Sequence, residues 1–137
     1  MEVRQERTGW RDQALSERHR RWGWDCPMLD IDFLALEYDK GVSVAIVEYK
    51  HENAEKQYSS HPSYRALRDL GDKADLPVFA VRYAGDFAWW LVVPLNSRAK
   101  QVVPERKKMT EREWVEVLYR LRNYELPDGL FDGLEEI

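Results

Sequence analysis

The segment LDIDFLALEYDKGVSVAIVEYK, residues 29–50, contains two apolar runs separated by the tripeptide DKG. Both runs are rich in aliphatic and aromatic residues, which favours β-strands over 29–38 and 42–50. Gly41 can adopt the positive φ that a short hairpin loop requires. The segment therefore predicts an antiparallel hairpin whose second strand ends in an acid and a base.

The register of this hairpin decides which charged side chains meet at its open end. Pairing the residues that flank the turn, Tyr38 and Val42, places Asp32 opposite Glu48. Cross-strand partners share a face of the sheet, and so do alternate residues of one strand. The charged residues predicted to converge are Asp30, Asp32, Glu48 and Lys50. A bulge at Gly41 would shift this register by one residue.

Two carboxylates that face each other across a hairpin repel unless a cation or a proton lies between them. Mg²⁺ prefers oxygen ligands and commonly takes one or two carboxylates together with waters and a substrate phosphate. A lysine beside such a pair can stabilise the negative charge of a transition state. The hairpin therefore predicts a site for phosphodiester hydrolysis that uses Mg²⁺ or Mn²⁺.

Outside the hairpin, apolar periodicity and turn residues predict the remaining elements. These are helices over 9–22, 62–73 and 111–123 and strands over 77–84 and 87–95. Thr110 and Glu113 form a capping-box pattern at the start of the last helix. A helix between the second and third strands is the crossover that a parallel pairing needs. The predicted fold is α/β (α+β), a mixed sheet of about four strands flanked by helices in the order αββαββα.

The length of 137 residues predicts a single domain over 1–137, with the acidic segment 124–137 as a loosely ordered tail. No apolar run reaches the ~18 residues of a membrane span, so no membrane partner is expected. Cys26 is the sole cysteine, which excludes an internal disulfide and a cysteine-based zinc site. The first ten residues are too polar for a secretory signal, and the sequence predicts a cytoplasmic protein.

A net charge of −4 argues against a nucleic-acid partner, but the charge is unevenly distributed. Residues 98–122 hold eight Lys or Arg and four acidic residues, and 1–22 hold six Arg and four acidic residues. The basic clusters consist of Arg18, Arg20, Arg21, Arg106, Lys107 and Lys108. One interpretation is solvated helix faces. The other is a pair of phosphate-binding arms that flank an acidic site.

Asp32, a gap of 15 residues and then Glu48-Tyr49-Lys50 at a strand end resemble the motif of the PD-(D/E)xK nuclease superfamily. This superfamily includes restriction endonucleases, Holliday-junction resolvases and phage exonucleases. The predicted element order also resembles the restriction-endonuclease-like core of this superfamily. The resemblance covers about residues 9–93, and a second Glu-x-Lys at 105–107 has no strand before it.

The resemblance implies roles for individual residues. Asp32 and Glu48 would be metal ligands, with the Tyr49 carbonyl as a third, and Lys50 would be the catalytic lysine. Glu17, on the first predicted helix, matches an acid that assists catalysis in this family. The chain lacks a literal Pro-Asp, since Pro27 lies three residues before Asp30. Asp30 therefore stays an alternative to Asp32 as principal ligand.

The leading hypothesis is a Mg²⁺- or Mn²⁺-dependent nuclease that acts on DNA, and the resemblance makes a homodimer an expected assembly. The alternative is a catalytically inactive nuclease-fold module that binds nucleic acid within a DNA-processing or phage-related assembly. A third reading is a small structural α/β protein in which Glu48 and Lys50 form a surface ion pair. A structure with Asp32 and Glu48 on opposite faces of the sheet would decide for it.

Overall fold

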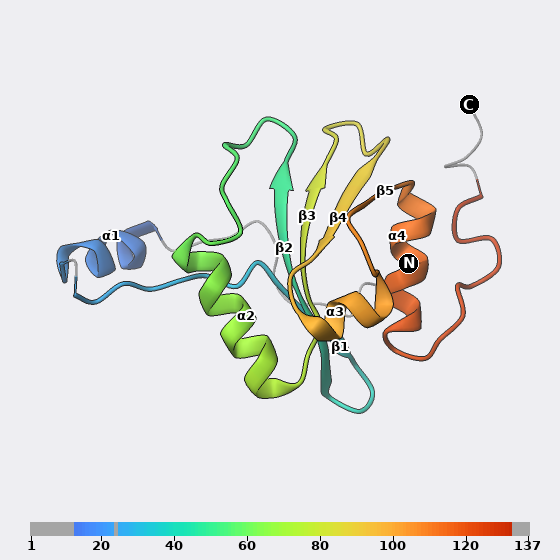
Figure 1. The fold of residues 1–137 in the computed structure, drawn as a ribbon, viewed down its shortest axis with the longest axis horizontal. Coiled ribbons are helices and arrows are strands. Elements are labelled where there is room, and N and C mark those ends of the chain that lie inside the picture. Colours follow the sequence, from blue (N-terminus) through green and yellow to red (C-terminus); the bar gives the residue numbers. More distant parts are fainter. Residues whose placement is uncertain (1–12, 24, 133–137) are drawn as a thin grey trace. The chain divides into compact units, whose positions relative to one another are not determined.

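A computed structural model of the chain describes residues 13–23 and 25–132. The chain divides into two compact units, residues 1–30 and 31–137. The first unit contains helix α1 (Gln13–Arg21), which buries none of its side chains. The predicted start of this helix, before residue 13, lies outside the described residues. The second unit contains the sheet and the other helices (Figure 1).

Within the described residues, five strands form one mixed sheet in the order β1-β2-β3-β4-β5. Strands β2 and β3 are parallel, and the other three pairings are antiparallel. The elements of the second unit are β1 (Phe33–Glu37), β2 (Val42–His51), α2 (Pro62–Ala74), β3 (Val78–Tyr83), β4 (Trp90–Pro94), α3 (Ser97–Val102), β5 (Lys107–Met109) and α4 (Glu111–Arg120). The predicted α/β class, mixed sheet and crossover helix are confirmed.

Two short elements were not predicted. Helix α3 has six residues and strand β5 has three, so neither is long enough to show a periodic apolar pattern. Asn96 nevertheless fixes α3, because its Oδ1 accepts hydrogen bonds from the N–H groups of Ala99 and Val78, each at 3.0 Å. The observed order is therefore αββαββαβα, with one more strand and one more helix than predicted.

The first hairpin reaches the predicted register through a bulge. At the turn Glu37, not Tyr38, pairs with Val42, so the predicted pairing there is wrong by one residue. The register shifts between Ala35 and Leu36, and beyond this point Phe33 lies opposite Val47. That is the register predicted for the open end, and extending it by one residue places Asp32 opposite Glu48. Strand β1 begins at Phe33, so Asp32 immediately precedes the strand.

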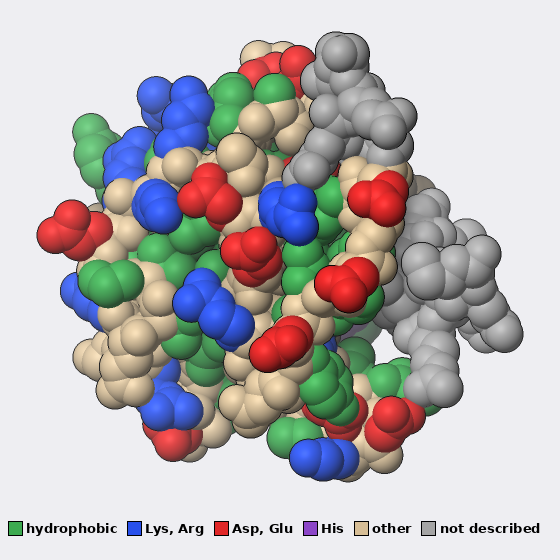
Figure 2. Space-filling model, turned by 90° about the vertical axis from the view of Figure 1, so that its right-hand side faces the viewer, with side chains coloured by type: hydrophobic (Ala, Val, Ile, Leu, Met, Phe, Trp, Pro, Cys, Tyr) green, Lys and Arg blue, Asp and Glu red, His purple; other side chains and the backbone are tan. Residues whose placement is uncertain are grey.

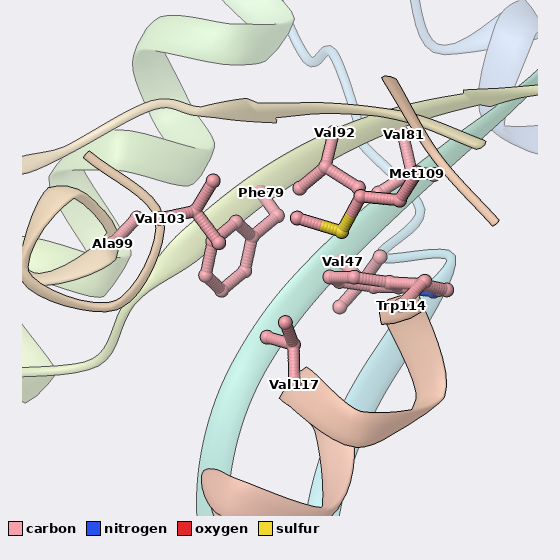
Figure 3. Packing of buried hydrophobic residues seen from close by; sticks show 9 residues of the cluster. All are labelled: Val47, Phe79, Val81, Val92, Ala99, Val103, Met109, Trp114 and Val117. Atoms are coloured by element: carbon pink, nitrogen blue, oxygen red, sulfur yellow. The ribbon is translucent and has the colours of Figure 1, made fainter. Parts of the chain in front are cut away.

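The core lies on both faces of the sheet. One cluster, on the α4 face, consists of Val47, Phe79, Val81, Val92, Ala99, Val103, Met109, Trp114 and Val117 (Figure 3). The other cluster, on the α2 face, consists of Ile46, Leu67 and Val78. Adjacent residues of β2 supply opposite faces, as strand geometry requires. Burial on both faces explains the continuous apolar run that precedes Glu48.

Helices α2 and α4 are positioned by local signals that the sequence carries. Pro62 occupies the first turn of α2, and Gly71 lets this helix approach β3, because a Cβ there would lie 2.2 Å from Val78 Cγ2. At α4 both hydrogen bonds of the Thr110–Glu113 capping box are present. This helix ends at Arg120, three residues earlier than predicted.

The segment after α4 contacts the rest of its unit as far as Asp132. The Tyr124 hydroxyl donates a hydrogen bond to Glu37 Oε1, and the Phe131 side chain is buried. The Tyr124 contact ties the start of the predicted tail to β1, and Phe131 lies beside Arg112 of α4. Residues 133–137 lie outside the described residues. None of the helices in the described part of the chain is long and apolar enough to span a bilayer.

Candidate active site

Asp32 lies at the open end of the first hairpin and is fixed to the neighbouring strand. Its Oδ2 accepts a hydrogen bond from the backbone N–H of Tyr49 at 3.1 Å. The Asp32 backbone and the Asp32 charge both act on the pKa of Glu48, which places the two residues close together. The two acids predicted to face each other are therefore neighbours. An arrangement on opposite faces, which would decide for the structural-protein reading, is not found.

The Glu48 carboxylate is buried, with the residue only 9% exposed. Burial in the protein raises the pKa of Glu48, and the nearby charge of Asp32 raises it further. Lys50 acts in the opposite direction, with its Nζ 3.4 Å from Glu48 Oε1. Glu48 Oε2 is buried and has no hydrogen-bond partner among the described residues. A buried carboxylate oxygen without a partner is costly, which favours a bound cation or a proton.

Tyr49 faces the other side of the sheet and anchors the strand end. Its hydroxyl accepts a hydrogen bond from Trp114 Nε1 at 3.0 Å, and its ring lies edge-on to Phe33. Burial raises the pKa of the Tyr49 hydroxyl above its ordinary value. The side chain therefore belongs to the core on the α4 face. A role of the Tyr49 carbonyl as a metal ligand stays a prediction.

The residues present fit a hard divalent cation held by few protein ligands. Between residues 13 and 132, leaving out Trp24, no cluster of three or more His, Cys, Asp and Glu side chains could hold a metal ion. Asp32 and Glu48 thus offer a two-carboxylate site. Mg²⁺ typically uses one or two carboxylates and fills its remaining positions with water and substrate phosphate. The unpartnered Glu48 Oε2 is the oxygen such a cation would satisfy.

A groove of about 750 Å³ opens beside Lys50 on the α2 face of the sheet. The strand ladder places four side chains of this face in a row across the sheet, Lys50, Arg82, Leu91 and Lys108. Leu91 and Val93 form part of the groove floor, and the loop after β2 forms one wall. The row connects the carboxylate site to the outer strand of the sheet.

Arg82 organises the wall of this groove and was not singled out from the sequence. Its Nη1 donates hydrogen bonds to the carbonyl oxygens of His51, Glu52 and Ala54 at 3.0, 3.3 and 2.9 Å. The loop that leaves β2 is therefore fixed against β3. The sequence signal that could have identified Arg82 is its position as the single cation within the apolar run VFAVRYA.

The predicted basic cluster at 106–108 is divided between the two faces of the sheet. Arg106 lines the groove, and Lys108 lies over the Trp89 ring, with Nζ 4.8 Å from its centroid. Lys107 points to the opposite face and pairs with Glu113 at 3.4 Å. Successive strand residues alternate between faces, so the cluster does not lie on one face, and the phosphate-binding role of its residues stays a prediction.

The other predicted site residues belong to the first unit, residues 1–30. Arg18, Arg20 and Arg21 are exposed in the last turn of α1, and Glu17 is exposed on the same helix. Asp30 is also exposed. The candidate site is consequently built from residues of the second unit alone, with Asp32 and Glu48 as its acids.

On the side of the molecule that carries α4, acidic and basic side chains are interspersed (Figure 2). Lys107 and Arg112 there pair with Glu113 and Glu116. Among the residues that the structure describes, this side offers no extended surface of one charge sign for a polyanion. No protein-family model, curated protein or solved structure matches the chain.

Proposed function

We propose that this protein is a nuclease that hydrolyses phosphodiester bonds, with DNA as the favoured substrate, and that it depends on Mg²⁺ or Mn²⁺. One observation carries the proposal: the buried, unpartnered Glu48 Oε2 beside Asp32 and Lys50. The resemblance of Asp32 and Glu48-Tyr49-Lys50 to the PD-(D/E)xK motif supports it. The hairpin and mixed sheet that present these residues are compatible with a restriction-endonuclease-like core.

Asp32 and Glu48 would hold the divalent cation. When bound, such a cation lowers the pKa of a water ligand and polarises the scissile phosphate. Lys50 reaches the same place from the end of β2, with its side chain 34% exposed. Its ammonium group is free to turn from Glu48 toward a phosphate oxygen, where it stabilises the negative charge that develops in the transition state.

The reaction is an in-line displacement at phosphorus. A bond forms between the water oxygen and phosphorus, and the bond from phosphorus to the leaving sugar oxygen breaks. The water gives up a proton to solvent, and the leaving oxygen takes one from solvent. Burial of Glu48 limits water around one side of the site, which strengthens the interaction between its carboxylate and any cation.

Cleavage of plasmid, branched and single-stranded DNA, measured with Mg²⁺, Mn²⁺ or EDTA, tests the proposal. We expect metal-dependent cleavage by the wild-type protein and by Lys107→Ala, whose changed side chain lies on the opposite face of the sheet. Glu48→Gln should not cleave. An inactive wild-type protein with every substrate and metal would reject the nuclease and favour the binding-module alternative.

A further inference from the structure

We infer that the groove beside Lys50 binds one strand of nucleic acid, with an unstacked base against Trp89 and the backbone running from Lys108 toward the carboxylates. The inference deepens the proposed function, on which the assignment of nucleic acid to this site rests. It adds the substrate form, a single strand, and the path that the strand follows.

The charge of the groove matches a phosphate backbone. Four cationic side chains line it, Lys50, Lys56, Arg82 and Arg106, together with a single acid, Glu52. Lys108 adds a fifth cation next to Trp89. Among the side chains that the structure describes, no ion pair joins Lys56 or Arg106 to an acid. Lys56 and Arg106 therefore remain available to phosphate groups, whereas Lys50 pairs with Glu48 and Arg82 donates to backbone carbonyl oxygens.

The floor of the groove is aliphatic and aromatic, so it suits the faces of bases and not further phosphate groups. Leu91, Val93 and Leu95 present partly buried aliphatic side chains to it, and the half-buried Trp89 ring lies in the same lining. Tyr58 also lines the groove and is 87% exposed. Aromatic rings of this kind stack with bases of any sequence.

This combination favours a single strand over a duplex. The base faces of a duplex are covered by their neighbours in the stack, so a duplex offers mainly phosphates and groove edges to a protein surface. A single strand exposes both a phosphate and a base face at each nucleotide. A cationic rim around an aromatic and aliphatic floor is the arrangement with which proteins bind single-stranded nucleic acid.

The groove is fixed before any ligand binds. Arg82 holds the wall at residues 51–54 through three carbonyl oxygens, and Glu52 Oε1 accepts a hydrogen bond from the Gly85 N–H at 3.2 Å. The wall is thus joined to β3 and to the turn after it. A preformed groove loses less conformational entropy on binding than a mobile loop would.

Binding is tested without metal, so that it is separated from cleavage. Fluorescence anisotropy in EDTA would compare a labelled oligothymidine with a blunt duplex of the same length over a series of salt concentrations. We expect the single strand to bind more tightly. Lys108→Ala should weaken its binding and make the log–log salt slope shallower by about 0.7 for each lost phosphate contact. Lys107→Ala is the matched control and should leave the slope unchanged.

Trp89 supplies an independent test. Trp89→Ala should weaken single-strand binding by about 5- to 150-fold, the equivalent of one base–aromatic stack. Trp89→Phe should restore most of the affinity, and thermal unfolding of each variant checks that the fold is intact. Equal affinity for duplex and single strand, or unchanged binding by Lys108→Ala and Trp89→Ala, would overturn the inference.

The outcomes also separate this inference from the proposed function. Metal-dependent cleavage by a protein whose Trp89 and Lys108 variants bind normally would reject the groove and keep the nuclease. Groove-dependent binding of single strands without cleavage under any metal would keep the groove and reject the nuclease.

Discussion

Asp32 accepts a hydrogen bond from the backbone N–H of Tyr49 across the open end of the first hairpin, with 3.1 Å between Oδ2 and the nitrogen. The contact ties an acid that precedes β1 to the strand that carries Glu48 and Lys50. One carboxylate therefore both fixes the hairpin end and places negative charge beside Glu48.

Asp32→Asn separates these two roles. The amide oxygen of asparagine can still accept the Tyr49 N–H, so thermal stability should change little. Cleavage should stop, because the second carboxylate is lost from the metal site. Metal-free DNA binding, measured by anisotropy, should hold or improve because a negative charge is removed. Asp32→Ala should lose about 1 kcal/mol of stability with the hydrogen bond. Wild-type cleavage by Asp32→Asn would remove this residue from the site.

Glu48→Gln should stabilise the metal-free protein at neutral pH. The pKa of Glu48 is raised in the folded state by burial and by Asp32, so the folded state binds its proton more tightly than the unfolded state does. The stability of the wild-type protein therefore falls as pH rises above about 4.3, the unfolded pKa of Glu. Unfolding temperatures across pH should show the advantage of Glu48→Gln disappearing in acid. A constant difference at every pH would contradict this origin.

Mn²⁺ should make the wild-type protein more stable than Glu48→Gln, the reverse of the order expected without metal. A ligand that binds only the folded state stabilises it by about 2.7 kcal/mol at one hundred times its Kd. We expect Mn²⁺ to raise the unfolding temperature of the wild-type protein and to leave Glu48→Gln and Asp32→Asn almost unchanged. Addition of EDTA should return the wild-type value. An equal shift in all three proteins would place the metal elsewhere.

Lys50→Ala should abolish metal-dependent cleavage and leave the protein folded. Lys50 lies near the end of β2, and its pairing with Glu48 is partly exposed, so the stability cost should stay within about 1 kcal/mol. Circular dichroism and a cleavage time course measure both effects, with Lys107→Ala as the lysine control. Cleavage at the wild-type rate would exclude Lys50 from the mechanism.

Tyr124→Phe should lower stability at neutral pH but not in acid. The Tyr124 hydroxyl, and then the Lys40 backbone N–H, hold the pKa of Glu37 below its ordinary value. Glu37 therefore contributes stability above the unfolded pKa, and this contribution is lost as pH falls through the lower folded pKa. Unfolding temperatures measured from pH 7 downward should converge. Tyr58→Phe, at an exposed position, should match the wild-type protein throughout.

Gly71→Ala should destabilise the protein, although alanine is the better helix former. The added Cβ would lie 2.2 Å from Val78 Cγ2 and 3.0 Å from the Leu76 carbonyl oxygen. Overpacking of this kind costs about 1–3 kcal/mol, more than the ~1 kcal/mol gained in helix propensity. Chemical denaturation measures the difference. Val78→Ala in the Gly71→Ala background should recover part of it, and an additive loss would argue against the clash.

The sequence determined the features that depend on neighbouring residues. Alternation along 42–50 placed Glu48 and Lys50 on one face, and the turn at Gly41 predicted the hairpin. Thr110 and Glu113 located the start of α4, because a capping box is satisfied within one turn. The Asp32–Glu48 pairing was anticipated from a Tyr38–Val42 register that is wrong at the turn, and it holds at the open end because of the bulge.

Tertiary structure decided what depends on distant pairings. The bulge between Ala35 and Leu36 corrects the register of the hairpin, and no local signal marked it. Pairing of β5 with β4 sends Lys108 to the face of the sheet that holds the groove, over the Trp89 ring, and Lys107 to Glu113, although the two lysines are adjacent in sequence. The groove joins residues more than 50 positions apart, from Lys50 to Arg106. Only the strand order sets such neighbours, because a hydrogen-bonded ladder fixes the face and position of every side chain it includes.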